Sequence, residues 1–155
     1  MDMLLRGLHV GFGELALFFT IATLFSLVWV SPKRKVGMAK IASLVGVISA
    51  FVSWLVSGLY YVIYYGPQVK PVIKGGSWPW AHGIFMEGKE HVFLFLPFIA
   101  MILLFLVWKY ADRWDEDRAV RLSIVTVGSI AIFITVLMAV SGYLISSGYR
   151  IAVLG

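Results

Sequence analysis

The sequence contains no cysteine among its 155 residues. This absence excludes disulfide bonds, thiolate metal sites, iron–sulfur clusters and covalent c-type haem attachment. Charged residues are scarce as well, because they make up 14% of the chain against 61% for hydrophobic residues, and the mean hydropathy is +0.92. A chain with so little polar surface cannot cover a water-soluble globule. We therefore interpret it as an integral membrane protein in contact with the lipid bilayer.

Several functional motifs are also missing. The sequence has no glycine-rich phosphate loop, no nucleophile–base arrangement and no dinucleotide fingerprint, so it predicts no catalytic residue. Its pI of about 9.6 does not require a nucleic-acid partner, since basic cytoplasmic loops beside anionic lipid produce the same value. We expect no binding to nucleic acid.

Four long apolar stretches remain, and each is long enough for a helix that crosses the roughly 30 Å hydrocarbon core of a bilayer. They predict helices over about 8–30, 41–65, 88–111 and 121–148. The stretches lack the alternating pattern of barrel strands. Because backbone N–H and C=O groups in lipid must hydrogen-bond within the protein, we expect each stretch to be a helix. The predicted fold is all-α, a four-helix bundle forming a single domain over residues 1–155.

The basic residues predict the orientation of these helices in a cell membrane. Eight lysines and arginines fall in the loops 31–40 and 109–121, against five on the other side of the membrane. Because cytoplasmic loops carry the excess of basic residues, we expect both of these loops to be cytoplasmic. The two termini and the loop 66–90 are then external.

The chain also contains what we interpret as an internal repeat. The first and third helices share an opening and an ending, and the second and fourth share an ending, in the same order and at nearly constant spacing. The matching segments are LHV at 8–10 with EHV at 90–92, LVW at 27–29 and 106–108, and VSG at 56–58 and 140–142. A duplicated two-helix hairpin follows, with a pseudo-twofold axis along the membrane normal.

The repeat makes His9 and His91 equivalent, at the external ends of the first and third helices. Ionisable residues at a membrane boundary are costly and usually have a partner. Histidine is the usual axial ligand of haem where no thiolate exists, so the pair predicts one bis-histidine haem b. Glu87 precedes His91 by four residues and would orient its imidazole from the same helix face.

Small residues near these histidines would leave room for a flat porphyrin. They are Gly11, Gly13, Gly58 and Gly142. The same glycines are equally typical of close packing between membrane helices. The histidines, likewise, can be interfacial residues whose polar tips face headgroups.

A metal ion without porphyrin is the alternative cofactor. His9, His91, His82, Glu14, Glu87 and Glu90 supply three imidazoles and three carboxylates on the external side, an inventory that suits copper or iron. The Glu-x-x-His pattern of di-iron bundles is not met, because Glu87 lies four residues before His91 and the second and fourth helices carry no carboxylate. Pro97, in addition, predicts a kink in the third helix.

Four helices, paired helix-end histidines and glycine-rich packing resemble the small four-helix membrane cytochromes b. Members of such families with two haems need four axial histidines, whereas this chain has three. The resemblance therefore implies one haem and an electron-transfer subunit of a respiratory complex, exchanging electrons with quinone or another redox partner. A copper- or iron-binding membrane protein and a cofactor-free structural subunit remain the alternatives.

Overall fold

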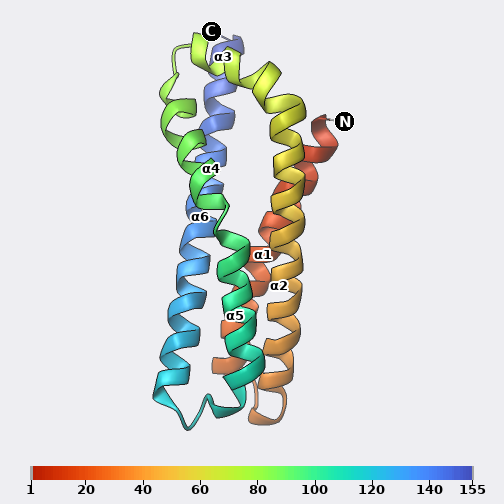
Figure 1. Ribbon diagram of the computed structural model, residues 1–155, viewed down its shortest axis with the longest axis vertical. Coiled ribbons are helices and arrows are strands. Elements are labelled where there is room, and N and C mark those ends of the chain that lie inside the picture. The colour runs from red at the N-terminus through yellow and green to blue at the C-terminus, as the bar shows by residue number, and fades with distance from the viewer. Residues whose placement is uncertain (1, 155) are drawn as a thin grey trace.

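Four long helical stretches lie side by side in the computed structural model, which describes residues 2–154 (Figure 1). Their main elements are α1 (Asp2–Trp29), α2 (Pro32–Tyr60), α5 (Leu96–Tyr110) and α6 (Arg118–Leu154). The described residues contain no strand. Four helices, Met3–Trp29, Lys33–Gly75, Ala81–Arg113 and Arg118–Leu154, are long and apolar enough to cross a membrane, which fits a multi-pass membrane protein. The predictions of an all-α fold and of four such helices are confirmed.

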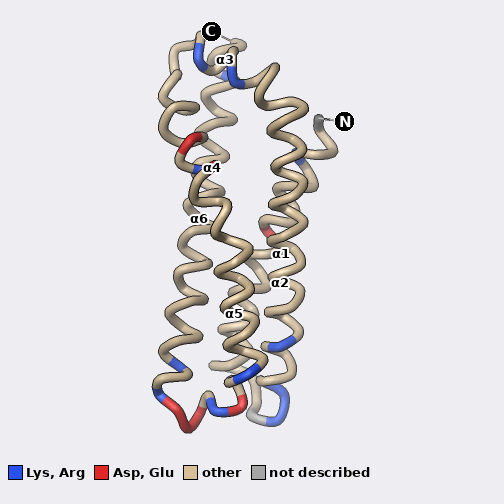
Figure 2. Tube along the Cα trace, viewed as in Figure 1, with Lys and Arg blue, Asp and Glu red and all other residues tan. Residues whose placement is uncertain are grey.

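Charged residues are distributed unevenly along the length of the molecule. We call the end with both chain termini and α3 (Lys70–Gly75) the terminal end, and the end with the 111–117 connection the loop end. Charged residues gather in the connections of the loop end, and the middle of the helices is almost free of them (Figure 2). At the loop end Lys35 pairs with Asp115, and Lys40 lies 3.2 Å from Asp112. These pairs join the start of α2 to the connection between α5 and α6.

Several hydroxyl groups inside the long helices form hydrogen bonds with backbone carbonyls of their own helix. The hydroxyls of Thr20, Thr23 and Ser26 donate to carbonyl oxygens four residues earlier, at 2.6–2.8 Å. Ser141 does the same on α6. A hydroxyl bonded to its own helix needs no water, so these residues are tolerated where lipid or other helices surround the backbone.

The segment 66–90 differs from the external loop predicted for it. It is mostly helical: α2 continues into the π-helix η1 (Tyr61–Val69) and α3, and after a short non-helical stretch come the π-helix η2 (Ala81–Met86) and α4 (Glu87–Phe93). Two of the prolines that suggested a loop lie within this continuous helical stretch, Pro67 inside η1 and Pro71 in the first turn of α3. The helix ends at Gly75 and Gly76, the latter with extended backbone.

The third helix is interrupted just before Pro97, the residue at which a kink was predicted. α4 ends at Phe93 and α5 begins at Leu96, with Leu94 and Phe95 between the two helices. Pro97 occupies the first turn of α5 and so avoids the loss of a helical hydrogen bond. This break lets α4 take its own direction above α5 and sets which of its side chains face the other helices.

Candidate functional site

His82 is the most unusual polar residue of the terminal end. Its side chain is fully buried at 0% exposure, and its Nδ1 lies 2.9 Å from the hydroxyl of Tyr65. Its Nε2 is buried as well and makes no hydrogen bond to any described residue. The nearest carboxylate oxygen is Oε1 of Glu87 at 3.9 Å, which is too far for a hydrogen bond. The buried imidazole of His82 therefore has a hydrogen-bond partner at Nδ1 and none among the described residues at Nε2.

A second unpartnered atom lies in the same region. Oε1 of Glu90 is buried and makes no hydrogen bond to a described residue, while the carboxylate lies beside the phenol of Tyr61. The rings of Tyr61 and Tyr65 stack, with centroids 5.4 Å apart. Five side chains from η1, η2 and α4 thus form one group, which we call the polar cluster: Tyr61, Tyr65, His82, Glu87 and Glu90.

Local backbone geometry places the polar cluster. Both phenols lie in η1 and His82 lies in η2, and π-helical turns are rare and frequent at functional sites. η2 is held against α6 by a glycine contact, since a Cβ on Gly148 would lie 2.7 Å from the Cβ of Ala81. Ala81 itself is fully buried next to His82. The absence of a side chain at Gly148 therefore lets α6 approach η2 closely enough to bury the imidazole.

His9 lies on α1 and bonds to α2. Its Nδ1 is 3.2 Å from the carbonyl oxygen of Ser53 and 3.0 Å from the Ser53 hydroxyl, which in turn donates to the carbonyl of His9 at 2.9 Å. The single hydroxyl proton is used in that last bond, so we assign the imidazole proton to Nδ1 from the network. Nε2 of His9 is then an acceptor, and no described residue bonds to it.

His91 lies on a different side of α4 from the residues that approach His9. Phe93 contacts the His9 ring edge-on with centroids 5.8 Å apart, and the charge of Lys89, one turn earlier on the same face of α4, acts on His9. Two residues along a helix correspond to about 200° of rotation, so His91 is directed away from that face. Its side chain is exposed. The structure does not bring His9 and His91 together, and a haem shared between them stays a prediction.

Glu87 behaves differently from the orienting role predicted for it. The Nδ1 of His91 donates to the backbone carbonyl of Glu87 at 2.7 Å rather than to its carboxylate. The carboxylate is 55% exposed and points toward His82 instead. The Glu87 side chain thus belongs to the polar cluster.

The glycines predicted to make room for porphyrin divide into two kinds. A Cβ on Gly11 or Gly58 would meet nothing within 4 Å. A Cβ on Gly13 would lie 3.5 Å from the Ser53 hydroxyl, and one on Gly142 would lie 3.4 Å from Nζ of Lys89. Gly13 and Gly142 therefore accommodate neighbouring polar side chains.

The described residues contain no group of three or more histidine or acidic side chains placed to hold a metal ion. Glu14 is exposed on α1, apart from the polar cluster. The six residues predicted as alternative metal ligands accordingly do not meet at one point in this structure.

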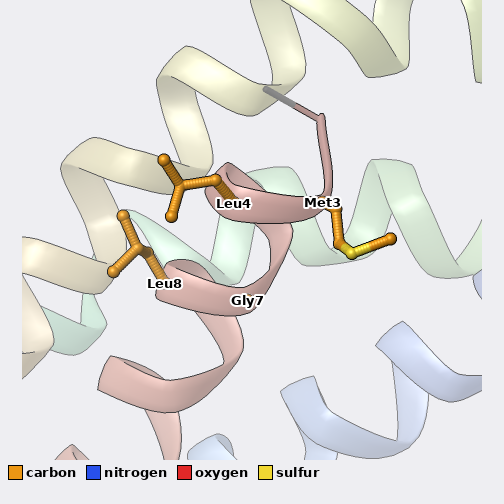
Figure 3. Close-up of a pocket in the computed structure, with 4 residues that line it drawn as sticks. All are labelled: Met3, Leu4, Gly7 and Leu8. Carbon is orange, nitrogen blue, oxygen red and sulfur yellow. The ribbon is translucent and has the colours of Figure 1, made fainter.

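A hollow of about 530 Å³ lies against the first turns of α1 (Figure 3). Its lining consists of Met3, Leu4, Gly7 and Leu8, and the surface it offers is almost wholly apolar. These residues lie on the side of α1 opposite His9, since their mean direction is about 180° from it around the helix. The hollow is separate from the ionisable residues described above.

Comparison with known proteins adds no relative: no protein-family model matches the chain, and no curated protein or solved structure does.

Three side chains of this region had no assigned role in the sequence interpretation. Ser53 lies in an apolar stretch with nothing to distinguish it from other helix serines. Tyr65 and Lys89 were not singled out either. One signal in the sequence could have indicated the polar cluster. Tyr61 and Tyr65 fall at the end of the second apolar stretch, and Glu87 and Glu90 fall at the beginning of the third, so all four lie at the same end of two successive helices.

Proposed function

We propose that this protein is a membrane subunit that exchanges protons at one membrane face in support of a redox partner in the same bilayer. The observation that carries the proposal is the buried imidazole of His82, bonded at Nδ1 to Tyr65 and open at Nε2. Imidazole takes up and releases protons near neutral pH more readily than any other side chain. Ionisable residues buried between membrane helices typically mark proton or ligand pathways.

The position of the cluster along the helices supports this proposal. About twenty residues of helix match a hydrocarbon core of roughly 30 Å. Counted from the aromatic residues at the loop end, Trp29 and Trp108, this length reaches His9 on α1 and the Gly88–Glu90 region of α4. Tyrosines such as Tyr61 are typical of such a boundary. We infer that the polar cluster lies at the terminal-end boundary of the bilayer, within reach of water.

The order of groups within the cluster suits proton movement. The partly exposed carboxylate of Glu87 lies 3.9 Å from Nε2 of His82, and Nδ1 of His82 meets Tyr65. A tyrosine hydroxyl can both donate and accept, so when Nε2 takes up a proton, Nδ1 can pass its own proton to the Tyr65 oxygen while that hydroxyl gives up its proton. The ring of Tyr61 stacks on that of Tyr65, and its phenol lies beside the carboxylate of Glu90, so we propose these two groups as the next acceptors in the series. Because His82 is fully buried, a proton enters this series more easily than a larger ligand would.

Infrared spectroscopy tests the proposal on the full chain in lipid nanodiscs. After a jump in the pH of the medium, we expect a carboxyl band that reports protonation of Glu90 and that disappears in Glu90→Gln. Tyr65→Phe keeps the aromatic stack but removes the hydroxyl that meets His82. It should slow the appearance of this band by about tenfold or more, a modest effect for removal of a proton-transferring group.

Glu116→Gln is the matched control, since Glu116 is an exposed carboxylate in the loop-end connection. It should leave both the band and its rate unchanged. A Tyr65→Phe protein with the wild-type rate, or a band that survives Glu90→Gln, would refute proton exchange through the polar cluster.

A haem b electron carrier is the second candidate function, and one observation favours it. The Nδ1–H of His9 and that of His91 are each bonded to a backbone carbonyl, which is the arrangement that prepares an imidazole to bind iron through Nε2. The two rings do not face one another within a chain, so we derive no shared haem from them. His9 alone is placed between the helices.

A further inference from the structure

Lys89 is held in an unusual setting for a lysine. Its side chain is half-buried, and its ammonium lies against α6, 3.4 Å from the position that a Cβ on Gly142 would occupy. No described residue forms a hydrogen bond or ion pair with it. An ammonium between membrane helices is costly unless a partner compensates its charge. Its surroundings therefore indicate an acceptor that does not come from the described side chains.

His9 has chemistry complementary to that of Lys89, and its imidazole lies within electrostatic reach of the Lys89 charge. Its Nδ1–H is bonded to Ser53, so its Nε2 is an unprotonated acceptor. The ring of Phe93 lies beside His9 on the same face of α4 as Lys89. Glu90 does not neutralise the ammonium, since it is turned about 100° around α4 and its carboxylate lies beside Tyr61. The site thus offers one strong donor, one acceptor and an aromatic edge.

We infer that Lys89 and His9 bind the headgroup of a membrane quinone. A quinone carbonyl accepts a hydrogen bond and suits the Lys89 ammonium, and the hydroxyl of the reduced form can donate to Nε2 of His9. The ligand is apolar enough to arrive through the bilayer, and its headgroup needs polar partners near the hydrocarbon boundary, where these residues lie. This inference rests on the proposed function, because reduction of a quinone takes up protons, and the polar cluster, which includes Glu90 on the neighbouring side of α4, would exchange them.

Gly142 has a specific role in this arrangement. The ammonium occupies the space beside its missing side chain, so a larger residue there displaces Lys89 without removing any charge. Gly142→Leu and Lys89→Met therefore alter the same contact by different means. Gly58 provides a matched control for the glycine change, since nothing lies within 4 Å of a Cβ at that position.

Quinone binding to the purified full chain in nanodiscs is the test. Short-chain ubiquinone and menaquinone analogues are titrated while quenching of tryptophan and tyrosine fluorescence is recorded. We expect saturable binding that weakens about tenfold or more in Lys89→Met, the size expected when a hydrogen bond to a charged group is lost. His9→Phe and Gly142→Leu should weaken it as well. Lys109→Met, at the loop end, and Gly58→Leu should not.

The melting temperature of each variant, measured in the same nanodiscs, shows whether it is folded. Absence of saturable quinone binding to the wild type, equal affinity in Lys89→Met, or tighter binding of a long-chain carboxylate than of either quinone would overturn the inference. The proton-exchange measurement separates the two proposals. If Tyr65→Phe slows proton uptake but no quinone binds, the headgroup site alone is wrong. If quinone binds as expected but Tyr65→Phe has the wild-type rate, proton exchange is wrong and with it the supply of protons from the polar cluster to the quinone.

Discussion

Replacing Gly148 by alanine tests how α6 holds η2 and the buried imidazole. The new Cβ would lie 2.7 Å from the Cβ of Ala81, whereas carbon atoms in good contact are about 3.5–4.0 Å apart. The two backbones must therefore separate by roughly 1 Å. Ala81 is fully buried and precedes His82 directly, so the shift moves the residue that bonds to Tyr65.

The magnitude follows from two opposing effects. Overfilling a packed contact costs about 1–3 kcal/mol, while alanine in place of glycine within a helix gains about 0.5–1 kcal/mol. We expect Gly148→Ala to lower the free energy of unfolding by up to about 2 kcal/mol, or roughly 2–4 °C of melting temperature per kcal/mol for a chain of this size. Gly58→Ala, with open space around its Cβ, should show the helix gain alone.

Thermal unfolding in nanodiscs, followed by intrinsic tryptophan fluorescence, measures both variants. The double variant Gly148→Ala with Ala81→Gly removes the Cβ that is struck and should recover most of the loss, because residues in direct contact show non-additive effects. If Gly148→Ala melts at the same temperature as Gly58→Ala, or if Ala81→Gly gives no rescue, the close contact does not hold η2 in place.

Two further predictions concern topology and cofactor content. The absence of cysteine allows single-cysteine labelling: Ser77→Cys at the terminal end should react with a membrane-impermeant maleimide on intact cells, whereas Ser31→Cys at the loop end should react only after permeabilisation. The opposite pattern would reverse the orientation predicted from the basic residues. The haem proposal predicts a Soret band in protein purified from haem-replete cells and its loss in His9→Ala, and loss in His91→Ala as well would favour a haem that both histidines bind. A colourless preparation contradicts it.

Hydropathy was enough to predict the four helices, because a bilayer selects long apolar stretches regardless of how they pack. A disturbance of the third helix near Pro97 also followed from the sequence, since proline is best tolerated in the first turn of a helix and here begins α5. The duplicated hairpin stays a prediction, as does the outward orientation of the terminal end. The segment 66–90 was misread because prolines and glycines at this density are typical of loops, whereas here the helix continues through Pro67 and Pro71.

The candidate site was harder to predict, and His82 shows why. In the sequence it lies between tryptophans and small residues, which is typical of an exposed interfacial loop, and His9 and His91 appeared more significant because they begin apolar runs. Burial of His82 depends on Gly148, which is more than sixty residues away in the chain and carries no chemical signal of its own.

The direction of each side chain of α4 could not be predicted from the periodicity of the sequence either. It depends on the break at Leu94 and Phe95, which detaches the rotation of α4 from that of α5. Once that rotation is set, adjacent residues serve different sides: Lys89 lies against α6, Glu90 lies beside the phenol of Tyr61, and His91 is exposed. The rotation of about 100° between these consecutive residues directs the Lys89 ammonium and the Glu90 carboxylate to different neighbours, so the carboxylate does not neutralise the ammonium. This separation leaves Lys89 without a described acceptor and Glu90 with an open oxygen, and both proposals made for this protein depend on it.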